Sequence, residues 1–197
     1  GVIRTKKLKI MNKEYTLSIF SENKIGLLQR LTVIFTRRKI NIDSLTTSES
    51  EVRGVYRFTV VIHTTPEQVR KVVKQIEKQI GVLKAFSFEA DEIVHQEIAL
   101  YKVPTKSLAH GDDVENIIRK HNAHILTVEP DYIIIEKAGH KEETQELFDK
   151  LLPFGVLQFA RSGRVAVTKQ IKEFTSYLRD LDEANKHSEK EVLLNYQ

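Results

Sequence analysis

The residues best suited to chemistry lie at positions 23–28, where Asn23 stands three residues before Gly26. If a helix begins here, its free backbone N–H groups and the positive end of its dipole attract an anion. Gly26 has no side chain, so a carboxylate can approach that backbone closely. The Asn23 amide can accept from an ammonium group or donate to a carboxylate. Three apolar side chains line the turn: Ile25, Leu27 and Leu28. The pattern fits a small aliphatic amino acid as ligand, and it also fits a plain helix-capping turn.

The elements that must hold this turn follow the order strand, helix, strand, strand, helix, strand. Residues 15–20 are rich in strand formers. The next helix is predicted by spacings of three and four among Ile25, Leu28, Leu31, Thr32 and Phe35. Further strands are predicted at 42–47, 55–63 and 82–88, and a second helix runs from Pro66 to Ile80 and ends at Gly81.

The second half repeats this order. Strands are predicted at 96–103, 123–129, 132–137 and 156–160, and helices at 113–120 (with Asp112 as N-cap) and 141–152. Gly81-Val82-Leu83 and Gly155-Val156-Leu157 stand at equivalent places, which indicates a duplicated unit. We therefore predict an α+β protein with two split βαβ sandwiches, at 12–91 and 94–169, and a helical tail at 170–197. Pairing with a second copy would cover their edge strands and open sheet faces.

Several segments of the sequence resemble the regulatory small subunit of acetolactate synthase (acetohydroxyacid synthase). They are Asn23-Lys24-x-Gly26-Leu27-Leu28-x-Arg30, Ile40-Asn41-Ile42-Asp43-Ser44-Leu45, Gln75-Ile76-Glu77-Lys78-Gln79, residues 97–103 and residues 160–166. The resemblance implies two ferredoxin-like βαββαβ domains in tandem, an N-terminal ACT domain followed by a C-terminal small-subunit domain.

In that family the chain has no catalysis of its own. It binds the catalytic large subunit, raises its activity and confers feedback inhibition by a branched-chain amino acid, usually valine. The effector lies between the ACT domains of a homodimer. By this resemblance Asn23, Gly26, Leu27 and Leu28 form the turn of one protomer, and Asn41 and Ile42 come from the other. Thiamine diphosphate, Mg²⁺ and FAD belong to the large subunit, so this chain is expected to hold no cofactor and no metal. Ile25 and Leu27 depart from residues common in the family, which leaves the ligand's identity open.

The composition of the chain excludes several other classes of function. The chain has no Cys, which excludes thiolate chemistry and disulfides. No apolar run reaches the roughly 20 residues of a membrane span, and we expect a cytoplasmic location. His110, Asp112 and Asp113 lie close together, as do His121 and His124, but no third ligand has a recognisable spacing. We interpret both sets as a polar loop and a helix end, not as a catalytic or metal site.

The charge pattern leaves two further alternatives. Residues 1–100 carry a balance of +6 and residues 101–197 one of −2. The basic half is either a solvated surface or a surface for an acidic partner. Residues 53–58 begin like the conserved strand motif of an RNA-binding domain. Tyr56 and Phe58 fall on the wrong face of the strand for stacking bases, so we expect no nucleic-acid partner.

Two other features leave alternatives open. Arg161-Ser162-Gly163-Arg164 is either a basic docking turn or a plain turn. An ACT sensor for a different enzyme is the other open alternative.

Overall fold

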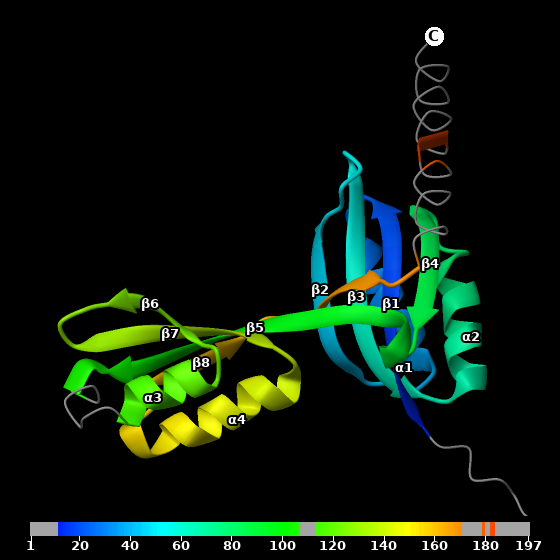
Figure 1. Ribbon diagram of the computed structural model, residues 1–197. Coiled ribbons are helices and arrows are strands. Elements are labelled where there is room, and N and C mark those ends of the chain that lie inside the picture. Colours follow the sequence, from blue (N-terminus) through cyan, green and yellow to red (C-terminus); the bar gives the residue numbers. More distant parts are fainter. Residues whose placement is uncertain (1–11, 107–112, 171–178, 180–181, 184–197) are drawn as a thin grey trace, which may run out of the picture. The chain divides into compact units, whose positions relative to one another are not determined.

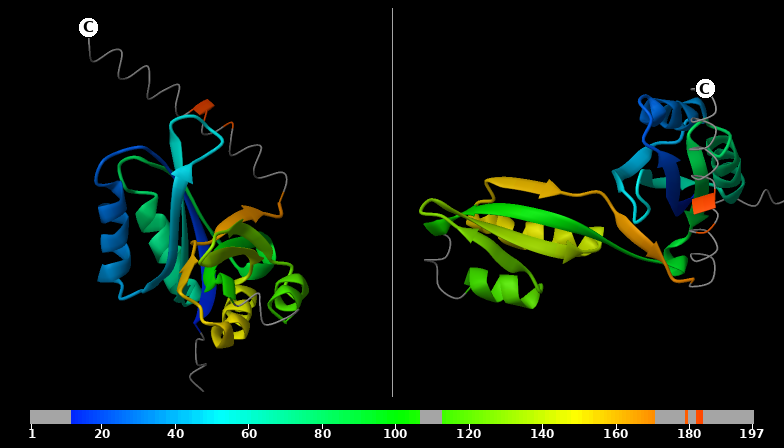
Figure 2. Two further views of the ribbon diagram at one scale, coloured as in Figure 1. Left: turned by 90° about the vertical axis from the view of Figure 1, so that its left-hand side faces the viewer. Right: turned by 90° about the horizontal axis from the view of Figure 1, so that it is seen from above.

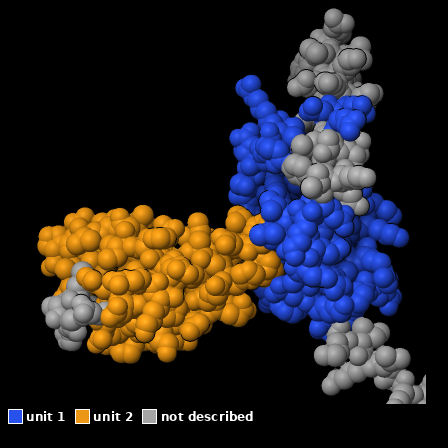
Figure 3. Space-filling model, viewed as in Figure 1, with its two compact units in different colours: residues 1–94, 167–197 blue, residues 95–166 orange. Residues whose placement is uncertain are grey.

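The computed structural model describes residues 12–106, 113–170, 179 and 182–183. The chain forms two compact units (Figures 1 and 3): residues 1–94 with 167–197 are unit 1, and residues 95–166 are unit 2. Most of the helical tail predicted at 170–197 lies outside the described residues. Within the described ranges, no helix combines the length and the apolar character needed to cross a membrane.

Unit 1 has the predicted order of elements. These are β1 (Lys13–Glu22), α1 (Leu27–Arg37), β2 (Ile42–Glu49), β3 (Val55–Thr64), α2 (Pro66–Ile76) and β4 (Val82–Phe88). The strands form an antiparallel sheet in the order β2-β3-β1-β4, so β2 and β4 are its edges. Both helices cover one face of this sheet (Figure 2). The core between the layers is made of branched and aromatic side chains, among them Leu17, Ile19, Phe35, Ile62 and Val72.

The helix faces of unit 1 correct the prediction at three residues. The buried face of α1 is Leu27, Leu31, Ile34 and Phe35. Ile25 precedes the helix and is fully exposed, while Leu28 lies about 100° around the axis from Leu27 and is 42% exposed. Helix α2 ends at Ile76, four residues early, so Ile80 lies in the following turn and is 77% exposed.

Unit 2 repeats the plan with an added strand. Its elements are β5 (Ile93–Pro104, which begins in unit 1), α3 (Asp113–Lys120), β6 (His124–Val128), β7 (Tyr132–Gly139), α4 (Lys141–Leu151) and β8 (Gln158–Arg161). A short 3₁₀ turn at Ala90–Glu92 precedes β5, and another at Leu152–Phe154 follows α4. The sheet order is β6-β7-β5-β8, and the unpredicted strand β9 (Val165–Thr168) also pairs with β5. The expected α+β fold of two tandem ferredoxin-like domains is confirmed.

A buried tyrosine hydroxyl is anchored by a hydrogen bond in the core of unit 2. Tyr101 is fully buried, and its hydroxyl donates a hydrogen bond of 2.6 Å to the Thr144 carbonyl of α4. Burial raises the pKa of the Tyr101 hydroxyl to about 12, because the charged form would lose its hydration. This bond ties the central strand β5 to helix α4.

Candidate functional site

The turn between β1 and α1 leaves the start of the helix open. We call residues 22–28 the glycine turn. Gly26 is the N-cap, with φ of 80° in the left-handed region, and a Cβ built there would meet nothing within 4 Å. Among the described residues no side chain caps α1, and the first turn of this helix holds no acidic residue. Because the first N–H groups of a helix need acceptors, this end of α1 suits a carboxylate from outside the chain.

The side chains of the glycine turn separate into two groups. Asn23 and Leu28 are exposed, as the predicted binding role requires. The Leu27 side chain is 2% exposed and packs in the core of unit 1, so it does not line a pocket there, contrary to the prediction. The Leu27 N–H donates to the Lys24 carbonyl at 3.3 Å, which closes the turn. Leu27 thus positions the helix start, and Ile25 and Leu28 supply the exposed apolar surface.

A second turn lies against the first. The Glu22 N–H donates to the Gly81 carbonyl at 2.9 Å, and the Arg30 guanidinium donates to the Ile80 carbonyl at 3.1 Å. These contacts bring the exposed Ile80 to the end of the unit that carries the exposed Ile25 and Leu28. Isolated exposed apolar residues are ordinary, whereas a group beside an uncapped helix start marks a surface fit to be covered.

Asn41 and Ile42 lie at the other end of α1. Asn41 is exposed just before β2, and Ile42 opens that edge strand opposite Ile62. Helix α1 has 11 residues, which at 1.5 Å each separates its ends by about 16 Å. One chain therefore does not bring Asn41 and Ile42 to the glycine turn. Beside them, His63 Nδ1 and Asp43 Oδ2 are 2.6 Å apart across β2 and β3.

The histidines that the sequence suggested as possible ligands do not gather into a site in the described part of the chain. His121 Nδ1 is 2.9 Å from the Ile117 carbonyl, and its Nε2 is 3.6 Å from a Glu146 carboxylate oxygen. His110 and Asp112 lie outside the described residues. Elsewhere in the described part of the chain, no three His, Asp or Glu side chains gather as metal ligands would.

The aromatic residues of β3 face the core. Phe58 belongs to the core cluster of unit 1, and Tyr56 packs against it on the helix side. On the other face Arg57 donates to Ser18 Oγ at 3.0 Å and lies 5.4 Å from the Phe20 ring centroid. Base-stacking domains present strand aromatics on that other face, so Tyr56 and Phe58 offer no platform for RNA.

The basic turn at 161–164 points its charges inward. Arg164 is 5% exposed. Arg161 Nε is 3.8 Å from the Glu97 carboxylate, and the Arg161 guanidinium donates to Gln145 Oε1 at 3.2 Å. These contacts favour the structural interpretation of the turn over the docking one.

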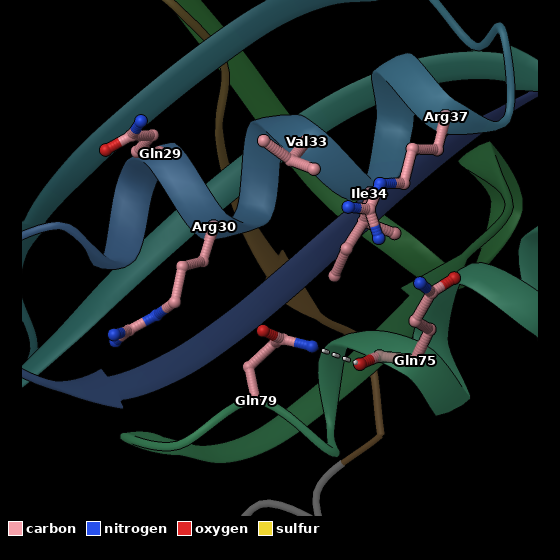
Figure 4. A pocket seen from close by; sticks show the side chains of 7 residues that line it. All are labelled: Gln29, Arg30, Val33, Ile34, Arg37, Gln75 and Gln79. Carbon is pink, nitrogen blue, oxygen red and sulfur yellow. Dashed lines mark hydrogen bonds between the residues drawn. The ribbon is translucent and has the colours of Figure 1, made fainter.

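One surface was missed by the sequence analysis. A groove of about 390 Å³ runs between α1 and the end of α2 (Figure 4), and we call it the α1–α2 groove. It is lined by Gln29, Arg30, Val33, Ile34, Arg37, Gln75 and Gln79. The excess of basic residues in 1–100 was the sequence feature that pointed to a cationic surface. The spacing of apolar residues along each helix does not show which of these cations share a groove.

The fold of unit 1, with its glycine turn before α1, is that of an ACT domain. Residues 17–84 match the family described as "AHAS small subunit-like ACT domain", and residues 96–170 match "Small subunit of acetolactate synthase". The acetolactate synthase small subunit of Bacillus subtilis (strain 168) is 33% identical over 84% of this chain and 95% of its own length. That of Mycolicibacterium smegmatis is 32% identical over 79% and 91%. The crystal structure of the small subunit from Thermotoga maritima covers 81% of this chain and 99% of its own, with a TM-score of 0.73 and 25% identity. The chain belongs to the family of acetolactate synthase small subunits.

Proposed function

We propose that this chain is the regulatory subunit of an acetolactate synthase, which binds the catalytic large subunit and raises its activity. The carrying observation is similarity along both units, since relatives named acetolactate synthase small subunit match over most of their length. Catalysis and its cofactors, thiamine diphosphate, Mg²⁺ and FAD, are assigned to the partner. In this proposal the chain acts by contact and by ligand binding alone.

The effector we propose is a branched-chain amino acid such as valine, bound between the ACT domains of two copies. Its carboxylate would lie at the uncapped start of α1 near Gly26, with the Asn23 amide beside it. Its aliphatic side chain would meet the exposed Ile25 and Leu28. Each of these features is present in one chain without a partner for it in the described residues.

The second half of the site would come from the paired copy. A two-fold axis beside edge strand β2 sets the α1 helices of two copies antiparallel, so the start of one lies near the end of the other. Asn41 and Ile42 directly follow the end of α1 in sequence. This arrangement explains why one chain holds the two predicted groups about 16 Å apart.

Regulation would follow from linkage between the effector and the catalytic subunit. The effector shifts the enzyme only by its differential affinity for the active and inhibited arrangements of the complex. A coupling of about 1–3 kcal/mol gives roughly fivefold to 150-fold regulation. In this proposal the chain takes no part in the chemical steps of the catalytic site.

Reconstitution tests the proposal. The purified chain is titrated into its catalytic subunit, and acetolactate formation is measured with and without valine, leucine and isoleucine. We expect activation by the chain, and inhibition by at least one of the three amino acids that needs the chain. Absence of activation would contradict the regulatory role. Co-purification of a different enzyme would favour the ACT sensor alternative.

A further inference from the structure

The helix layer of unit 1 carries a cationic surface that the effector site does not use. Residues 27–39 and 66–80 hold eight Lys and Arg side chains and two carboxylates. Both carboxylates are engaged, Glu67 with Lys71 at 2.6 Å and Glu77 with Lys84 at 3.0 Å. The remaining positive charge therefore has no counterpart on this layer.

Two of these cations lie in the α1–α2 groove. Arg30 and Arg37 project from α1, and Gln75 and Gln79 line the opposite side (Figure 4). Within the described ranges, no carboxylate lies within ion-pair distance of Arg30 or Arg37. Arg30 is held by the Ile80 carbonyl, whereas Arg37 is exposed with its donors directed to no acidic group of the described chain. The groove thus offers guanidinium groups ready for a carboxylate.

The groove is held open by its own contacts. Arg38 Nε donates to Gln75 Oε1 at 2.9 Å, and its terminal nitrogen donates to Gln68 Oε1 at 3.3 Å. Gln79 Nε2 donates to the Gln75 carbonyl at 3.3 Å. The two Arg38 bonds link the end of α1 to α2, and the Gln79 bond fixes the far side of the groove, so little ordering is needed when a partner binds.

The dimensions favour a protein segment over a small anion. Arg30 and Arg37 are seven residues apart on α1, about 10 Å along its axis. Val33, 38% exposed, and the buried Ile34 lie between them. A helix with acidic residues two turns apart matches the spacing of Arg30 and Arg37 on α1 and the apolar side chains between them. Interface centres commonly combine Arg with apolar contact in this way.

We propose that the α1–α2 groove is where the catalytic large subunit docks, through a segment with carboxylates that pair with Arg30 and Arg37. This inference rests on the proposed function and names its contact surface. The groove is lined by residues of α1, α2 and the turn after α2, and the edge strand β2 that would pair two ACT domains contributes none of them. One chain can therefore bind its copy and its enzyme at once.

The test compares two charge reversals of equal size. Arg30→Glu with Arg37→Glu alters the groove, and Arg70→Glu with Lys74→Glu alters exposed residues of α2 outside it. Affinity of each full-length variant for the purified catalytic subunit is measured at low and moderate salt. The groove pair should weaken binding about tenfold or more and reduce its salt dependence, and the control pair less than about threefold. Arg37→Gln alone, at an exposed residue, should weaken binding severalfold without loss of thermal stability.

Three results would overturn the inference. Equal losses in the two pairs would mean that general charge attraction brings the subunits together. Unchanged affinity in the groove pair would exclude the groove. Altered self-association with unchanged affinity for the enzyme would assign the groove to a second copy. If the unaltered chain itself neither binds nor activates the catalytic subunit, the proposed function fails, which is a distinct outcome visible before any variant is made.

Discussion

The two units share one order of elements but present helices of opposite charge. The helix layer of unit 1 has a balance of +6, whereas residues 113–122 and 141–154 of unit 2 hold four basic and six acidic side chains, a balance of −2. Both layers bury a comparable apolar core. The alternating and helical apolar positions set the fold, so the outer helix faces are free to differ between the copies of the plan.

The units also differ in the polar groups that they bury. In unit 1 the buried polar side chains of the described residues are hydroxyls, such as Thr16, Ser18 and Thr59. In unit 2 Glu97, Lys137 and Arg164 are each at most 6% exposed. Buried charges persist when they are paired, as Glu97 is with Arg161. Unit 2 thus uses charge internally, while unit 1 turns its cations and its uncapped helix outward, toward other molecules.

The largest effects are expected from matched truncations in the two cores, which test whether the units are stabilised separately. Ile62 of β3 and Ile135 of β7 are both fully buried. Each Ile→Ala change should cost about 2–5 kcal/mol, because it removes apolar contacts and leaves a cavity. Amide hydrogen exchange should show the loss in the mutated unit alone, and calorimetry should show weakened effector binding for Ile62→Ala only. Equal loss of protection in both units would contradict separate cores.

The second prediction concerns the glycine turn. Gly26→Asp places a carboxylate where that of the effector would bind, so affinity for valine should fall at least about a hundredfold, near 2.7 kcal/mol. Activation of the catalytic subunit should persist, as measured in the reconstituted enzyme.

Gly54→Asp is the matched control for this change. Gly54 has φ of 79° and, like Gly26, open space around a built Cβ, but it lies in the turn between β2 and β3. Gly26→Asn separates the charge from the backbone conformation, and it should lose far less affinity than Gly26→Asp. Valine sensitivity that survives Gly26→Asp would refute the proposed site.

The third prediction concerns the anchored tyrosine of unit 2. Tyr101→Phe removes the hydroxyl and leaves the Thr144 carbonyl without this donor. We expect a loss of about 1–3 kcal/mol in the free energy of unfolding, measured by denaturant titration. Effector affinity should not change, because unit 1 is untouched. A stability equal to that of the unaltered chain would mean that another donor replaces the hydroxyl.

The smallest effect is expected at the start of α4. The Glu143 carboxylate accepts the His140 N–H at 2.6 Å, and this hydrogen bond lowers the pKa of Glu143 below its ordinary value of 4.5. Because the folded-state pKa is the lower one, the stabilisation is present above about pH 4.5 and is lost as the pH falls through the folded value. Glu143→Ala should remove this pH dependence at a cost of a few tenths of a kcal/mol. Exchange of the His140 amide, followed from pH 7 to 3, checks it.

The order of elements was predictable because each local pattern agrees with the fold. Strand β4 and helix α3 have the predicted bounds, and Pro66 opens α2 as a residue without an N–H can. Strand β9 was missed, since a four-residue run has no periodicity to detect and becomes a strand only by pairing with β5. Ile25 and Ile80 were predicted to lie on the apolar faces of the two helices because their spacing fits the helical repeat. In the structure α1 begins only at Leu27, after Ile25, and α2 ends at Ile76, before Ile80.

The sequence by itself determined the duplicated plan, the glycine turn and the family, because these depend on residue types at fixed local spacings. The tertiary structure alone decided which side chains are available. It buries Leu27 and Arg164, exposes Ile25 and Leu28, and brings Arg30 and Arg37 to face Gln75. The physical reason is that exposure and charge pairing depend on neighbours supplied by distant segments, and no local pattern specifies those neighbours.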